Sequence, residues 1–168
     1  MTNVSTVTQV ALGRASTDVV IKVDLDDRAF LFPQLKAVQQ LSLHVHSQSR
    51  VRFEMAFAFN QARSSTLLME LGAEEAAELS RKLVESVYRA QGSQIVTRTL
   101  SIGIVVVANG YIVQINEHNL QTELFLSTGC IWRVCNAIMR AVDLVPEGQR
   151  LAEREGADLF LLHALDQA

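Results

Sequence analysis

Two histidines and two carboxylates have the residue types and the spacing of a metal site. One residue separates His44 from His46 in an alternating segment, so on a strand both imidazoles lie on one face, about 7 Å apart. Zn²⁺ accepts two imidazoles when a third ligand comes from elsewhere in the fold. Glu54 and Glu70, on strands expected alongside, can supply it, and His44, His46 and Glu54 form our candidate set. The alternative interpretation is a solvated polar face beside a loop.

A second candidate is a cysteine nucleophile. Cys130 follows Gly129 at the expected start of a helix, a position that stabilises a thiolate. His118 lies on an earlier turn and can act as its base, which gives a Cys–His pair. The alternative is a small buried hydrophobe, the usual role of a free cysteine. Cys135 lies about 140° around the same helix from Cys130, so no disulfide is expected between them, and a reducing compartment is favoured.

Other motifs of known chemistry do not fit the sequence. Asp24, Asp26 and Asp27 resemble the start of a Ca²⁺ loop, but Ala29 and Leu35 occupy the positions that need Gly and Glu. An Asp-rich turn is the better interpretation. The chain has neither a Gly-rich phosphate loop nor a G-x-S-x-G elbow. We therefore expect no cofactor, except Zn²⁺ if the histidine site forms.

Composition indicates one folded α+β domain over residues 1–168. Hydrophobic residues make up 49 % of the chain and charged residues 20 %, a globular balance. The net charge is −3 without any basic stripe, so a nucleic-acid partner is not expected. No apolar run is long enough for a membrane span, and the N-terminus does not resemble a signal peptide. These features predict a soluble, cytoplasmic protein with no membrane contact.

Alternating apolar and polar residues predict several strands in the first half of the chain. Residues 1–8 are small and polar, and we expect a frayed tail there. A strand is predicted over Asp18–Leu25, and a short helical segment over residues 33–41, which begins with Pro33. Further strands are predicted over Leu41–His46, Val51–Phe59 and Thr66–Leu71, followed by a helix over Ala73–Gln91.

The second half repeats this order of elements. A strand is predicted over Ile95–Ala108, with a break near Ser101, and Asn109-Gly110 predicts a hairpin with a type I′ turn. The remaining expected elements are strands over Tyr111–Asn116 and Leu120–Leu126 and helices over Cys130–Leu144 and Arg150–Leu165. The plan is therefore two antiparallel three-stranded meanders, each followed by a helix (βββα-βββα), with an additional N-terminal strand and C-terminal helix. It resembles that of the small dimeric chaperones of bacterial secretion systems, which implies a homodimer and a protein partner.

The segment Ile102–Ala108 is apolar on both expected faces of its strand. A strand with one solvated face would alternate, so both faces must be covered. The helix over Ala73–Gln91 can cover one face, and a second sheet, the C-terminal helices or a second copy of the chain must cover the other. Of these we favour a second copy, because symmetric dimers are common and an exposed face of this kind would aggregate. The C-terminal segment Gly156–Leu165 is also apolar. The candidate interface residues are Ile102, Ile104, Val106, Leu159 and Phe160.

These observations favour a non-enzymatic, dimeric protein-binding or regulatory module of the chaperone or adaptor kind. The alternative is a protein, either an enzyme or a non-catalytic binder, that binds a small molecule or a metal through His44, His46 and a nearby carboxylate.

Overall fold

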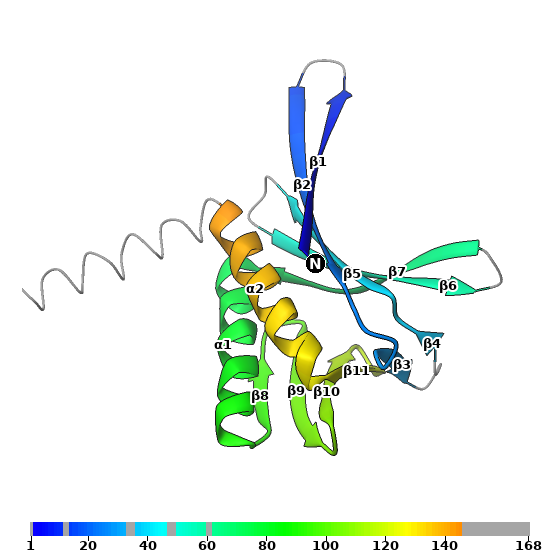
Figure 1. Cartoon of the computed structure of the whole chain (residues 1–168). Coiled ribbons are helices and arrows are strands. Elements are labelled where there is room, and N and C mark those ends of the chain that lie inside the picture. The colour runs from blue at the N-terminus through cyan, green and yellow to red at the C-terminus, as the bar shows by residue number, and fades with distance from the viewer. Residues whose placement is uncertain (1, 12–13, 33–35, 47–49, 60–61, 146–168) are drawn as a thin grey trace, which may run out of the picture.

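The computed structural model describes residues 2–11, 14–32, 36–46, 50–59 and 62–145. Two antiparallel sheets and a pair of helices make up this part of the molecule (Figure 1). No helix among these residues is long and apolar enough to cross a membrane.

The first sheet, sheet A, has the strand order β1-β2-β5-β6-β7. Its β2–β5 and β5–β6 ladders place the expected apolar positions on one face, where Ile21, Leu43 and Phe53 are buried. A bulge opposite Phe53 and Glu54 lets both Leu68 and Met69 reach the buried side. The strands are β1 (Thr2–Ala11), β2 (Arg14–Asp24), β5 (Gln40–His46), β6 (Arg50–Phe59) and β7 (Ala62–Gly72).

The second sheet, sheet B, has the order β4-β3-β11-β10-β9-β8. The chain enters it twice, first through β3 and β4 and again after sheet A is complete. As a result, β3 pairs with β11 from the far end of the described sequence. The strands are β3 (Phe30–Phe32), β4 (Lys36–Ala37), β8 (Ser93–Val96), β9 (Leu100–Val107), β10 (Gly110–Glu117) and β11 (Leu120–Ser127).

Helices α1 (Ala73–Arg89) and α2 (Thr128–Leu144) lie side by side (Figure 1). The Gly72 amide donates to the Glu75 carboxylate across the first turn of α1, at 2.9 Å, and Ala90 ends the helix with a left-handed φ of 49°. Ser80 and Cys135 bond between the helices in both directions. Both sheets and both helices contribute to one apolar core, whose central cavity is only about 20 Å³.

The α+β class and the two meanders are confirmed. β5-β6-β7 leads into α1 and β9-β10-β11 leads into α2, and the meanders belong to different sheets. The predicted strand Asp18–Leu25 falls largely within β2. The strand break expected near Ser101 lies slightly earlier, at residues 97–99 between β8 and β9. The helix predicted over Arg150–Leu165 lies outside the described residues.

Three local predictions are corrected. Residues 2–11 form β1 along the whole of β2, where a frayed tail was expected over residues 1–8. The predicted helical segment 33–41 is wrong, because Lys36–Ala37 pairs with β3 and Gln40 opens β5. β7 begins at Ala62, before the expected Thr66, because it follows β6 to the tip of their hairpin.

The predicted β9–β10 hairpin is confirmed, but its turn is displaced by one residue. Gly110 pairs with Val107, so the loop residues are Ala108 and Asn109, and of these only Asn109 is left-handed, with φ 68°. The left-handed pair typical of a type I′ turn occurs in the β10–β11 hairpin, at His118 (45°) and Asn119 (69°).

Candidate functional site

Two of the predicted metal ligands, His44 and Glu54, lie together on the outer, solvent-facing side of sheet A. His44 Nε2 lies 3.3 Å from Glu54 Oε2, and both side chains are about one-quarter exposed. Arg52 Nε lies 3.0 Å from the other Glu54 oxygen, close enough for an ion pair although not aligned as a hydrogen bond. This guanidinium already balances the carboxylate, which opposes a metal cation at the same place.

The remaining candidate ligands do not join this pair in the described structure. Glu70 is held by Arg50, whose Nε lies 2.8 Å from its carboxylate. The backbone of His46 pairs with Arg50, and its side chain lies outside the described residues. Among the described side chains there is no group of three or more His, Cys, Asp or Glu residues able to hold a metal.

The proposed Cys–His pair is wrong. Cys130 is fully buried in the first turn of α2, next to the Ser127 end of β11. His118 is 77 % exposed at the opposite end of the β10–β11 hairpin, about 24 Å away along the strand. Cys130 Sγ instead accepts from the Asp26 amide at 3.4 Å and from Arg133 Nη2 at 3.3 Å. The thiol therefore joins α2 to the turn that follows β2.

Asp26 is the anionic member of this cluster. Burial raises the pKa of its carboxyl, but hydrogen bonds from Ser127, Cys130 and the Arg28 amide, together with the charge of Arg133, outweigh burial and lower that pKa below 3.8. The Ser127 hydroxyl donates to Asp26 rather than capping α2. The carboxylate thus stabilises the fold above about pH 3.8, and this contribution is lost as the pH falls through its lower folded pKa.

Cys135 is the other free thiol, and it too has a packing role. Burial raises its pKa to about 11, with hydrogen bonds to Ser80 partly opposing the rise. The side chain is therefore a neutral thiol at physiological pH, and it lies between α1 and α2.

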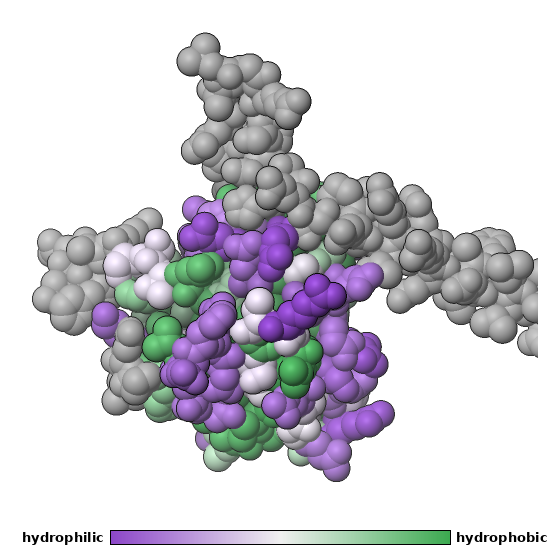
Figure 2. Space-filling view, turned by 180° about the vertical axis from the view of Figure 1, so that it is seen from behind, coloured by the Kyte–Doolittle hydropathy of each residue, from purple (hydrophilic) through white to green (hydrophobic). Residues whose placement is uncertain are grey.

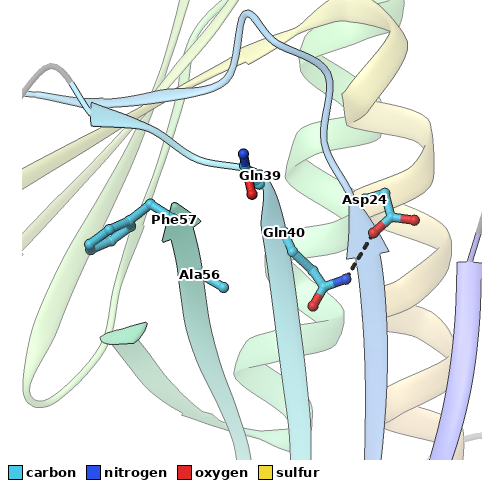
Figure 3. A pocket seen from close by; sticks show the side chains of 5 residues that line it. All are labelled: Asp24, Gln39, Gln40, Ala56 and Phe57. Carbon is cyan, nitrogen blue, oxygen red and sulfur yellow. Dashed lines mark hydrogen bonds between the residues drawn. The ribbon is translucent and has the colours of Figure 1, made fainter. Parts of the chain in front are cut away.

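A pocket of about 200 Å³ opens where β2 ends and β5 begins (Figure 3). Gln40 Nε2 donates to Asp24 Oδ1 at 2.8 Å, and the two side chains point toward each other, whereas Phe57 points away from them. This hydrogen bond joins the end of β2 to the start of β5. The pocket is lined by Asp24, Gln39, Gln40, Ala56 and Phe57.

A wider groove of about 410 Å³ lies at the start of α1, between Arg50 and the turn before β9. It is lined by charges of both signs, among them Arg98, Glu74 and Glu75. Two of these groups already have partners, since Glu75 caps the helix and Arg50 pairs with Glu70. The groove therefore presents no surplus of one charge to a ligand.

The predicted interface residues of β9 lie on the buried face of sheet B. Ile102 and Ile104 are 0 % and 1 % exposed, and Val106 is partly buried against the same core. This chain covers them itself, so they are not available to a second copy. Leu159 and Phe160 lie outside the described residues.

The opposite face of sheet B carries an apolar row that the sequence interpretation missed. The ladders place Val105 opposite Ile112, Ile112 opposite Phe125, and Phe125 opposite Phe30, so the row crosses four strands. Val105 is 39 % exposed and the other three are partly exposed. Figure 2, taken from behind, shows apolar side chains along the lower edge of the molecule, the part that sheet B occupies in Figure 1.

Aromatic packing holds one end of this row in place. The Phe30 ring stacks on Phe125 with centroids 4.9 Å apart and meets the edge of Phe32 at 5.0 Å. Gly110 shares this face, and a Cβ there would approach the Phe125 ring to 2.7 Å. The absence of a side chain at Gly110 therefore lets the ring lie across β10.

Comparison with known proteins identifies no relative: no family model, curated protein or solved structure matches the chain.

Proposed function

We propose that this chain is a non-enzymatic protein-binding module that acts as a homodimer, with the apolar row on sheet B as the centre of its interface. The observation that carries the proposal is the row itself, Val105, Ile112, Phe125 and Phe30, aligned in register and partly exposed. Contiguous apolar surface of this kind is typical of a binding site.

The surroundings of the row have the character of an interface rim. Two residues further along β10 and β11, on the same face, Gln114 Nε2 donates to Glu123 Oε1 at 2.8 Å. Gln121 Nε2 donates to the same oxygen at 3.0 Å. An apolar centre with a polar, hydrogen-bonded margin is the usual anatomy of a protein interface. A standard interface buries roughly 800 Å² per partner, so both the row and its margin would be covered.

A face-to-face pair of these sheets is also geometrically simple. Two copies related by a two-fold axis bring the same row against itself, so one apolar surface satisfies both protomers. The thiols of Cys130 and Cys135 are free and buried, which suits a reducing, cytoplasmic compartment.

Sedimentation equilibrium of the full chain tests the proposal. The wild type is expected at twice its 18.6 kDa mass. Ile112→Lys places a charge in the centre of the row and should weaken dimerisation at least about 30-fold, which is about 2 kcal/mol. The matched control is Leu120→Lys, an equally apolar residue that is 74 % exposed at the β10–β11 hairpin.

The control should dimerise like the wild type. A wild-type protein that stays monomeric at every concentration, or a dimer that Ile112→Lys leaves intact while the variant remains folded by circular dichroism, contradicts the proposal.

A further inference from the structure

The chain leaves sheet A between β2 and β5 and forms a short arm that joins sheet B. A hydrogen bond from the Leu25 amide to the Gln39 carbonyl, at 2.9 Å, closes the base of this arm. Between these two residues lie β3 and β4, which form the edge of sheet B beside β11 (Figure 1). We call the described residues 26–32 and 36–38 the β3 arm. The β3 arm supplies Phe30, the last residue of the apolar row.

The β3 arm has only short ladders to hold it in the sheet. β3 pairs with β11 over three residues, and β4 pairs with β3 over two, whereas most strands run to about five or six residues. Ala29, Leu31 and Val38 are buried and anchor the arm on the core. Phe30 lies on the opposite face, so its position also depends on the turn that leads into β3.

That turn, Asp26–Ala29, is built around Asp26. The Ala29 amide donates to the Asp26 carbonyl at 3.0 Å, which closes the turn, and the Arg28 amide donates to Asp26 Oδ1 at 3.1 Å. An aspartate that binds the amide two residues further along the chain is typical of such turns. Phe30 follows the turn directly, so the geometry at Asp26 sets the direction in which β3 starts.

Asp26 also binds this turn to β11 and to α2. The Ser127 hydroxyl donates to Asp26 Oδ2, and the Asp26 amide donates to Cys130 Sγ at 3.4 Å. Ser127 lies two residues after Phe125, whose ring stacks on Phe30. Asp26 therefore fixes the turn before Phe30 and also joins that turn to the strand that carries Phe125.

The charge of Asp26 strengthens these links. Burial raises the pKa of its carboxyl, but its hydrogen bonds and the charge of Arg133 outweigh burial and lower that pKa, so the group is anionic at neutral pH. Hydrogen bonds to an ionised acceptor are about twice as strong as those between neutral groups. Asparagine keeps one acceptor oxygen without the charge, so Asp26→Asn is the conservative substitution.

We propose that Asp26 is a positioning residue of the homodimer interface, which holds Phe30 against Phe125 at one end of the apolar row. This inference rests on the proposed function, because the row is the centre of the proposed interface. Asp26 is not a member of the row and acts on the partner surface only through Phe30.

Hydrogen exchange tests the first step, from Asp26 to β3. It is measured in Ile112→Lys, which is expected to be monomeric, so the result does not depend on dimerisation. In that background Asp26→Ala should speed exchange of the peptide that contains Phe30–Phe32 at least about tenfold, and Asp26→Asn should speed it less. Asp27→Ala is the matched control, because it removes an exposed acid from the same turn and should leave exchange unchanged. Unchanged exchange in Asp26→Ala contradicts the positioning role.

Sedimentation equilibrium tests the second step, from Phe30 to the interface. Phe30→Ala and Asp26→Ala should each weaken dimerisation at least about tenfold. Because Asp26 acts through Phe30, adding Asp26→Ala to Phe30→Ala should weaken dimerisation by less than about twofold more. A residue that only stabilised the fold would weaken dimerisation by the same factor in both backgrounds. Asp27→Ala should dimerise like the wild type.

Two results overturn the positioning role while the wild type dimerises. One is wild-type dimerisation of Asp26→Ala, and the other is an equal effect of Asp26→Ala with and without Phe30→Ala. Circular dichroism checks that each variant is folded, and if Asp26→Ala is not, Asp26→Asn should give the same pattern with a smaller effect. A wild type that stays monomeric overturns the proposed function instead, and the exchange measurement still decides whether Asp26 holds β3.

Discussion

The outer faces of the two sheets differ sharply, although their inner faces are alike. Sheet A presents charged and polar cross-strand contacts to solvent, the ion pair of Arg50 with Glu70 and the contact of His44 with Glu54. Sheet B presents the apolar row of Val105, Ile112, Phe125 and Phe30. The inner faces of both sheets pack into one shared core.

This difference distinguishes the apolar surface that stabilises the fold from the apolar surface that is left for a partner. Burial of the inner faces satisfies the stability requirement of each sheet, and a charged outer face such as that of sheet A suffices for contact with water. In a single chain the apolar row of sheet B is only partly buried, so it stabilises the fold less than the inner faces do. We attribute it to the proposed homodimer.

Two substitutions of buried side chains by alanine test whether the inner faces of both sheets belong to one core. Phe53 in sheet A and Leu124 in sheet B line the same small cavity, and their side chains are 1 % and 2 % exposed. The two substitutions are Phe53→Ala and Leu124→Ala. Each should lower the free energy of unfolding, by about 3–5 kcal/mol for Phe53 and about 2–5 kcal/mol for Leu124. Urea unfolding followed by circular dichroism and by Trp132 fluorescence should give coincident single transitions. Separate transitions for the two probes would show that the sheets do not share one cooperative core.

The outer face of sheet B is tested at Gly110. In Gly110→Ala the added methyl group meets the Phe125 ring and the backbone of β11, so the ring must move. We expect a loss of about 1–3 kcal/mol in thermal unfolding, together with weaker dimerisation. Gly129→Ala is the control, because a Cβ there has only the Ser127 hydroxyl within 4.0 Å. A fully stable Gly110→Ala would mean that the ring does not lie across β10.

The outer face of sheet A should respond least. Glu54→Gln removes the charge that His44 and Arg52 share, at a site with one-quarter of its side chain exposed. Ion pairs this close to water contribute about 0–1 kcal/mol, so stability should fall by no more than that, and dimerisation should not change. Chemical denaturation and sedimentation measure the two quantities. A larger loss of stability, or a melting temperature that Zn²⁺ raises in the wild type but not in Glu54→Gln, would favour the metal interpretation.

The sequence predicted the elements of the meanders well because their periodicity is strong. Alternation over Val51–Phe59 and the stripe over Ala73–Gln91 each permit one kind of element. The segment Lys36–Ala37 was misassigned because its pairing with β3 is a tertiary contact that overrides local helical spacing.

The candidate site was harder to predict because it depends on register. Local sequence shows that Phe30 and Phe32 share a face, but not that Phe30 pairs with Phe125 from the other end of the chain. The apolar segment Ile102–Ala108 was recognised, yet the interface was predicted at Ile102 and Ile104, which are buried, while the exposed Val105 was not named. Which face of a fully apolar strand is buried is set by the helices that pack on it, and alternation cannot reveal this.

The early placement of β3 has a consequence for the newly made chain. Its Phe-Leu-Phe segment is synthesised long before β11, and Asp26 and Ser127, which join the same two regions, are 101 residues apart. At ordinary translation rates the ribosome needs roughly 5–20 s to cover that distance. Throughout that interval Phe30, Leu31 and Phe32 lack β11, the strand that pairs with them in the finished protein. The nascent chain is therefore open to misassociation at β3, although Leu31 is only 2 % exposed once the protein has folded.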